Sequence, residues 1–94
     1  SAYFFLIAEA MIDEAVAEGF TRAVATDLVV GTMLGSATLL HETGEALTSA
    51  RYAVTSPGGA TAQAIAALEE GGIRALMARG MRAAADTSRK MEER

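Results

Sequence analysis

Residues 28–40 read LVVGTMLGSATLL, a run without a single charged side chain. A helix on the surface of a protein shows a polar stripe along one side, so a helix without one is typical of burial on all sides. Gly31 and Gly35 lie four residues apart, and glycine lets another backbone approach closely. A chain of 94 residues is too short to wrap this helix completely. We therefore expect a second copy to cover it, in a homodimer with an extensive apolar interface.

The same run raises the alternative of a transmembrane helix. Its thirteen residues span about 20 Å at 1.5 Å per residue, which is short of a hydrocarbon core about 30 Å thick. The net charge of −4 and the lack of a basic amphipathic helix also disfavour a bundle that binds lipid surfaces. An acidic chain is equally unsuited to the phosphates of nucleic acid. We expect neither a membrane nor a nucleic acid as a partner.

Composition excludes several kinds of chemistry. The chain has no cysteine and a single histidine, which excludes disulfides, thiolate catalysis and a metal site built from several histidines. We therefore expect no metal. The first positive charge, Arg22, follows the first apolar stretch, so the start of the chain lacks the pattern of a secretory signal. A soluble, cytoplasmic protein is the expectation.

The segments on either side of residues 28–40 also show helical spacing. Of all residues 51% are hydrophobic but only 5% are aromatic, and the abundant alanine favours closely packed helices. Gly19 is a natural end for the first helix, and Thr21 is a natural N-cap for the second. No window shows the alternation of a strand. The predicted fold class is all-α, with five helices over residues 3–18, 22–41, 45–54, 60–70 and from 73 to near the C-terminus.

The gap between the third and fourth helices is unusually rich in turn residues. Residues 54–65 read VTSPGGATAQAI and contain the only proline of the chain, Pro57, followed by Gly58 and Gly59. A simple connection between two helices needs only one glycine or a capping residue. The stretch is not a Walker loop, because no lysine follows the glycines, and it is not a dinucleotide fingerprint after a strand.

This gap has the parts of an anion-binding site. The start of a helix leaves backbone N–H groups unpaired and carries about half a positive charge. Gly58 and Gly59 remove side chains that would block these groups, while Ser56 and Thr61 add hydroxyl donors. The combination suits a carboxylate or a phosphate. An ordinary N-cap with a flexible entry loop is the alternative, and the spacing alone slightly favours it.

Longer stretches of the sequence resemble a known family. The stretch AVTSPGGATAQAIAALEEGGIRALM, the opening AYFFLIAEAMIDEAVAEGF and the uncharged second helix together resemble the Δ1-pyrroline-5-carboxylate reductases. The resemblance implies that residues 1–94 are the C-terminal dimerisation and substrate-binding domain, related to the C-terminal domain of 6-phosphogluconate dehydrogenase. Its helices would intertwine with those of a second copy, and the dimers could assemble further. The implied reaction is the reduction of 1-pyrroline-5-carboxylate to L-proline with NADPH or NADH, the last step of proline biosynthesis.

The resemblance also assigns roles to the residues of the loop. It implies that the substrate carboxylate lies against the loop and that the Thr61 hydroxyl, as the catalytic group, donates to the ring nitrogen. The implied substrate-binding residues are Ser56, Gly58, Gly59, Ala60 and Thr61. Family members carry an N-terminal Rossmann domain that binds most of the nicotinamide cofactor, and no such pattern occurs in this sequence. We therefore expect a fragment without activity of its own. The alternative is a non-catalytic helical oligomerisation module whose glycine-rich loop is only a turn.

Other polar residues are expected to have plainer roles. His41 lies at a helix end and is interpreted as a solvated capping residue. Tyr52 and Thr55 flank the loop and are expected to shape it without taking part in chemistry. Glu69 and Glu70 precede a glycine stop and are expected on the surface.

Overall fold

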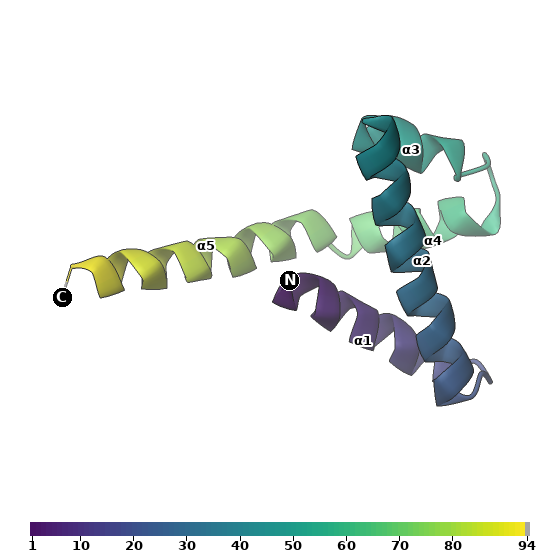
Figure 1. Ribbon diagram of the computed structural model, residues 1–94, viewed down its shortest axis with the longest axis horizontal. Coiled ribbons are helices and arrows are strands. Elements are labelled where there is room, and N and C mark those ends of the chain that lie inside the picture. The colour runs from purple at the N-terminus through teal and green to yellow at the C-terminus, as the bar shows by residue number, and fades with distance from the viewer. Residues whose placement is uncertain (94) are drawn as a thin grey trace. The chain divides into compact units, whose positions relative to one another are not determined.

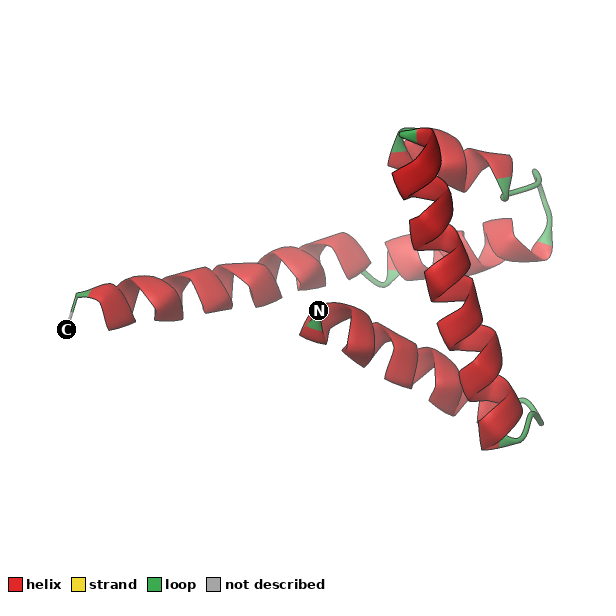
Figure 2. Ribbon diagram, in the orientation of Figure 1, coloured by secondary structure: helices red, strands yellow, loops and turns green. Residues whose placement is uncertain are grey.

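The computed structural model describes residues 1–93, and within them it contains five helices and no strand (Figures 1 and 2). The remaining residue of the predicted 1–94 domain, Arg94, lies outside the described residues. The prediction of an all-α fold with five helices is confirmed. The helices are α1 (Ala2–Ala17), α2 (Arg22–Thr43), α3 (Leu47–Ala53), α4 (Ala60–Glu70) and α5 (Ile73–Glu92).

Capping residues set most of these boundaries. Thr21 caps α2, and its side-chain oxygen accepts a hydrogen bond from the backbone N–H of Val24 at 3.3 Å. Gly44 ends α2 in the left-handed conformation, with φ of 66°. Gly19 follows α1 with φ of 116°, a backbone conformation that other residues rarely adopt. The second helix runs two residues beyond the predicted His41, because the left-handed glycine comes only after Thr43.

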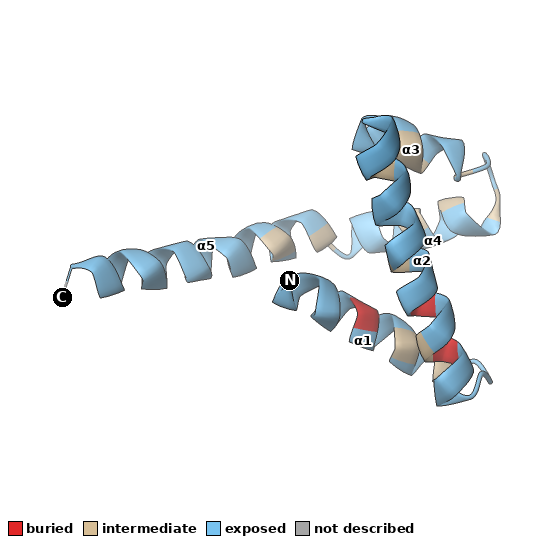
Figure 3. Cartoon of the chain, in the orientation of Figure 1, coloured by how far each residue is buried: buried red, intermediate tan, exposed pale blue. Residues whose placement is uncertain are grey.

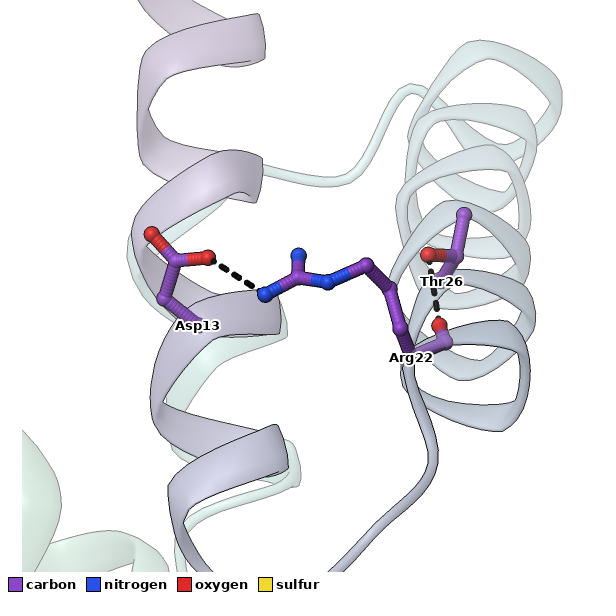
Figure 4. Close-up of polar contacts among 3 residues, drawn as sticks. All are labelled: Asp13, Arg22 and Thr26. Atoms are coloured by element: carbon purple, nitrogen blue, oxygen red, sulfur yellow. Dashed lines mark hydrogen bonds and ion pairs between the residues drawn. The ribbon is translucent and has the colours of Figure 1, made fainter.

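The chain divides into two units, and the first spans Ser1–Ala50. Its helices α1 and α2 pack against each other through Ala8, Ala25 and Val29, which are its only buried residues among those described. An exposed ion pair joins the Asp13 carboxylate to the Arg22 guanidinium at 3.2 Å (Figure 4). Surface pairs of this kind contribute little, so the small apolar side chains at the contact hold the two helices together.

Most of the large apolar side chains in this unit are uncovered (Figure 3). Phe4 and Leu34 expose 67% and 69% of their surface, and Leu28 and Val30 expose about half. Helix α2 was predicted to be buried on all sides, yet only Ala25 and Val29 are buried within this chain. The chain therefore does not cover α2 by itself, and the missing cover has to come from outside it.

The length of α2 changes the argument about membranes. The predicted run of thirteen uncharged residues lies within a helix of 22 residues, which is about 33 Å long at 1.5 Å per residue. By length and composition α2 could cross a membrane, and it is the one helix of which this is true in residues 1–93. Helices in the cores of soluble proteins share these features. The length of α2 therefore does not distinguish a transmembrane helix from a helix that is buried by protein.

The second unit begins at Arg51 and contains α4 and α5. These helices are separated by Gly71 and Gly72, and Gly72 has φ of 83°. The Nε–H of Arg74 donates a hydrogen bond that both oxygens of the Glu69 carboxylate share, at 2.8 and 3.0 Å. The expectation that Glu69 lies on the surface is correct, but this side chain also bridges the break between the two helices.

Candidate functional site

The residues Ser56 to Gly59 form a hydrogen-bonded turn. The N–H of Gly59 donates to the carbonyl oxygen of Ser56 at 3.0 Å, which closes the turn across Pro57 and Gly58. Gly58 has φ of 72°. Proline at the second position and a glycine with positive φ at the third are what a type II turn requires. The sequence S-P-G-G therefore matches the requirements of a type II turn.

Both glycines of the turn have a structural reason to be glycine. Gly58 needs its positive φ, although a Cβ added there would meet nothing within 4 Å. Gly59 has an ordinary φ of −80°, but a Cβ added there would lie 3.3 Å from the carbonyl oxygen of Ser56. The sequence argument assigned these glycines to ligand access, with a simple turn as the alternative. The structure adds the geometry of the turn: Gly58 has a positive φ, and a Cβ on Gly59 would be in tight contact with the Ser56 carbonyl oxygen.

The turn leads directly into α4 and leaves its first N–H groups free. Gly59 is the N-cap and supplies no side-chain hydrogen bond. The N–H of Gln63 is the first to bond back, to the carbonyl oxygen of Gly59 at 3.1 Å. The N–H groups of Ala60, Thr61 and Ala62 form no hydrogen bond with any residue in the described part of the chain. Free N–H groups and the helix dipole together favour an anion at this position.

The hydroxyl groups around the turn differ in their partners. Ser56 and Thr61 are exposed, and neither hydroxyl bonds to another residue within the described range. Thr55 is half-buried, and its hydroxyl donates to the carbonyl oxygen of Arg51 at 2.6 Å. As expected, Thr55 shapes the loop: it ties the entry of the turn to the end of α3. Ser56 and Thr61 remain free to donate to a bound group, as do the amides of Ala60 and Thr61.

Arg51 is a residue that the sequence analysis did not single out. Its backbone holds Thr55, and its guanidinium carbon lies 5.0 Å from the centre of the Tyr52 ring. The pKa of the Glu69 carboxyl group is lowered chiefly by its hydrogen bond with Arg74, and the charge of Arg51 makes a smaller contribution in the same direction. Arg51, near the end of α3, thus interacts with the loop through a hydrogen bond and with the end of α4 through its charge. Its position four residues before Thr55 was the available signal, but the link to Glu69 requires the fold.

The pair Glu69 and Arg74 carries the clearest electrostatic effect in this unit. The hydrogen bond from Arg74 is the main cause that holds the pKa of Glu69 below its ordinary value, while desolvation of the carboxylate acts in the opposite direction. The same hydrogen bond raises the pKa of Arg74. Both groups remain charged near neutral pH, so their role is to hold the α4–α5 connection and not to transfer protons.

No metal centre accompanies the loop. Residues 1–93 contain no group of three or more histidine or acidic side chains placed to hold a metal ion. The loop itself contains no lysine or arginine, so an anion there would be held by N–H groups, hydroxyls and the helix dipole. Such donors suit a carboxylate or a phosphate.

A known protein family matches almost the whole chain. The family model described as pyrroline-5-carboxylate reductase dimerisation matches residues 1–91. The chain belongs to this family. The resemblance drawn from the S-P-G-G and L-E-E-G-G stretches is therefore confirmed.

Individual proteins that are similar to this chain are named pyrroline-5-carboxylate reductase. The pyrroline-5-carboxylate reductase of Corynebacterium melassecola is 43% identical over 90 residues, which cover 96% of this chain and 33% of that protein. The enzyme of Escherichia coli (strain K12) is 39% identical over 92 residues, covering 98% of this chain and 34% of that protein. The chain thus spans about a third of the length of the curated relatives that it matches.

A solved structure shows the same fold. The crystal structure of Plasmodium falciparum pyrroline carboxylate reductase with NADP bound matches with a TM-score of 0.89 and 29% sequence identity. The match covers 93% of this chain and 34% of that one. The helical arrangement described above therefore occurs in a protein that carries a nicotinamide nucleotide.

Proposed function

We propose that this chain is the substrate-binding and dimerisation part of a reductase that converts 1-pyrroline-5-carboxylate to L-proline. The observation that carries the proposal is the start of α4, where three free N–H groups and the Thr61 hydroxyl follow a rigid turn. The family match supports the same reaction. The reaction closes proline biosynthesis, and we assign the protein to the cytoplasm.

The substrate carboxylate binds at the turn. The N–H groups of Ala60, Thr61 and Ala62 and the hydroxyl of Ser56 supply the donors, and the dipole of α4 adds about half a positive charge. Hydrogen bonds to a charged acceptor are worth about 1.5–3 kcal/mol each, so a few of them suffice without a lysine or arginine. Gly58 and Gly59 serve this binding by fixing the turn and by leaving the backbone uncovered.

The Thr61 hydroxyl polarises the carbon–nitrogen double bond. Reduction of the imine carbon pushes electrons onto the ring nitrogen, and a hydrogen bond to that nitrogen stabilises the developing charge. Thr61 is the second residue of α4, so its side chain and the amides beside it act on one small substrate. Threonine is too weak an acid to be the final proton source, and the proton that neutralises the nitrogen comes from water.

The hydride donor requires residues that the described chain does not provide. Residues 1–93 contain no strand, and the sequence has no glycine fingerprint after a strand. This chain therefore does not fit a nicotinamide nucleotide by itself. We assign the binding of NADPH or NADH chiefly to a Rossmann domain, as the family resemblance implies.

The working form is a homodimer. The uncovered apolar faces of α1 and α2 and the family's description as a dimerisation domain both support a second copy as the cover for α2. Burial of α2 by protein also accounts for its apolar length without a membrane, and the acidic charge gives no support to a nucleic-acid partner.

An activity assay tests the proposal. The full-length protein that contains this chain is mixed with 1-pyrroline-5-carboxylate and a reduced nicotinamide, and cofactor absorbance and proline are followed. Proline formed in step with cofactor oxidation is the expected result. A folded, dimeric protein that binds the nicotinamide but forms no proline would leave the chain as an oligomerisation module, the alternative function.

A further inference from the structure

The loop before α4 is attached to the last residues of α3 by three hydrogen bonds. The carbonyl oxygen of Arg51 accepts the backbone N–H of Val54 at 3.3 Å and the hydroxyl of Thr55 at 2.6 Å. The backbone N–H of Thr55 donates to the carbonyl oxygen of Tyr52 at 3.1 Å. The end of a helix leaves carbonyl oxygens without an intrahelical partner, and here the loop pairs two of them. The entry of the loop is therefore fixed to the end of α3.

The side chain of Arg51 extends to α4. It lines a groove of about 410 Å³ together with Ile65 and Leu68, which belong to the second half of α4. Glu69, at the end of the same helix, lines this groove as well. Arg51 is half-buried, and a half-buried arginine lays its carbon chain on apolar surface while its charged end stays near water. The same residue thus holds the loop through its backbone and lies against α4 through its side chain.

The charge of Arg51 acts on the end of α4. The hydrogen bond from Arg74 has the largest effect in lowering the pKa of Glu69, and the charge of Arg51 adds to it. Arg51 forms no ion pair with any of residues 1–93, so its charge is not taken up elsewhere in that range. The Tyr52 ring, 5.0 Å from the guanidinium carbon, limits the positions that this group can take. Attraction between exposed charges is weak, so Arg51 biases the position of α4 without locking it.

The two attachments of Arg51 act on opposite ends of one segment. The loop attachment lies just before the turn, and the side-chain attachment lies near the end of α4. This helix has 11 residues and is about 16 Å long at 1.5 Å per residue. Because a helix moves as a rigid rod, a displacement of its end also displaces its start. The free N–H groups of Ala60, Thr61 and Ala62 lie at that start.

We propose that Arg51 is a positioning residue for the substrate: through Glu69 its side chain holds α4 where the free N–H groups meet the substrate carboxylate. The inference rests on the proposed function and adds to it a residue that acts through α4 and not on the reacting atoms. Without this side chain, α4 occupies other positions part of the time, and the apparent affinity falls in proportion. Saturating substrate restores the productive position, so kcat changes little.

Steady-state kinetics of the full-length protein test the proposal. In Arg51→Gln the KM for 1-pyrroline-5-carboxylate should rise about fivefold, the effect of losing one exposed charge interaction. The kcat and the KM for the nicotinamide should stay within about twofold of wild type. Arg51→Lys keeps the charge and should recover most of the affinity. The matched control, Arg79→Gln, removes the same charge from α5 outside this groove.

A merely structural role would give a different pattern. Loss of stability alone lowers the amount of active enzyme, and therefore the measured kcat, without raising KM. A fall in kcat at an unchanged KM overturns the positioning role of Arg51. The same holds if Arg51→Gln and Arg79→Gln have the same KM, or if Arg51→Lys is as impaired as Arg51→Gln.

A double variant tests the route through Glu69. Glu69→Gln removes the carboxylate on which Arg51 acts, so adding Arg51→Gln to it should raise KM little further. Residues that act independently have effects that multiply in the double variant. Multiplied effects, or an unchanged KM in Glu69→Gln alone, would show that Arg51 does not hold α4 through this carboxylate.

Backbone amide signals of the isotope-labelled full-length protein give a measurement that does not depend on catalysis. In Arg51→Gln the signals of Ala60, Thr61 and Ala62 should shift before any ligand is added, and half-saturation by L-proline should need about five times the concentration. In Arg79→Gln both should match wild type. Unchanged signals and affinity in Arg51→Gln overturn its positioning role. A wild-type protein that forms no proline overturns the proposed function instead, and the signals without ligand still decide whether Arg51 positions α4.

Discussion

The backbone N–H of Gly59 donates to the carbonyl oxygen of Ser56 at 3.0 Å, and this bond fixes the turn that starts α4. The turn places the Ser56 hydroxyl just before the free N–H groups of the helix. The turn and the start of α4 therefore bring together the donors that the proposed function assigns to the substrate carboxylate. The turn, the Thr61 hydroxyl, the α4–α5 connection and the dimer interface can each be tested by a separate variant.

Gly58→Ala should destabilise the protein. An L-residue at φ of 72° is strained, and the free energy of unfolding should fall by about 1–2 kcal/mol. Denaturation at a fixed protein concentration measures the change. Gly71→Ala is the matched control, since φ there is −72° and its Cβ would lie 3.4 Å from the Ala67 carbonyl oxygen. Equal stability of the two variants would contradict the turn described above.

Thr61→Ala should slow the reductase without dispersing the dimer. Loss of a hydrogen-bond donor that acts mainly in the transition state lowers kcat by about 10²–10³. Thr61→Ser keeps the hydroxyl and should recover most of the rate. Thr55→Ala is the control, because its hydroxyl is bonded to the Arg51 carbonyl oxygen and its loss should affect stability more than kcat. A wild-type rate in Thr61→Ala means that Thr61 has no catalytic role.

Glu69 should titrate below the ordinary carboxyl range. The hydrogen bond from Arg74 lowers its pKa in the folded protein relative to the unfolded chain, so the pair stabilises the fold above the ordinary pKa of 4.5. This contribution is lost as the pH falls through the lowered, folded-state pKa. Carbon NMR of the Glu69 carboxyl should show the low midpoint, and Arg74→Gln should return it toward 4.5. An unchanged midpoint in Arg74→Gln would show that Arg74 does not lower the pKa of Glu69.

Gly35→Leu should weaken the dimer. A Cβ added at Gly35 would meet nothing within 4 Å in this chain, so the chain itself gives no packing reason for the glycine. A large side chain would instead separate α2 from a partner backbone. Ala23→Leu, at an exposed position before the uncharged run, is the control. A folded Gly35→Leu protein that dimerises as tightly as Ala23→Leu contradicts the role of this face.

The helices were predictable because their signals are local. Apolar spacing, Thr21 and the glycines at positions 19, 44 and 71–72 placed every helix to within a few residues. The function of the glycines was harder to predict. Positive φ at Gly58 and the close approach of Gly59 to Ser56 depend on backbone geometry, and the spacing alone slightly favoured an ordinary N-cap with a flexible entry loop.

Two features could not be derived from local patterns. Glu69 and Arg74 are five residues apart, a spacing that does not bring side chains together within one helix, and they meet only because Gly71 and Gly72 redirect the chain. Arg51 acts on Glu69 from a different helix. In contrast, the prediction that α2 needs external cover rested on the absence of charge, which is visible in the sequence itself.

The most direct test of the central claim is a titration of the isotope-labelled chain with L-proline, followed by the backbone amide signals. We predict saturable shifts of the Ala60, Thr61 and Ala62 amides, which are absent with pyrrolidine, an analogue that lacks the carboxylate. Signals in α1, such as that of Ala8, should stay in place. Two results would contradict the assignment of the start of α4 as the carboxylate site. In the first, proline shifts other amide signals but not these three; in the second, pyrrolidine shifts these three as much as proline does.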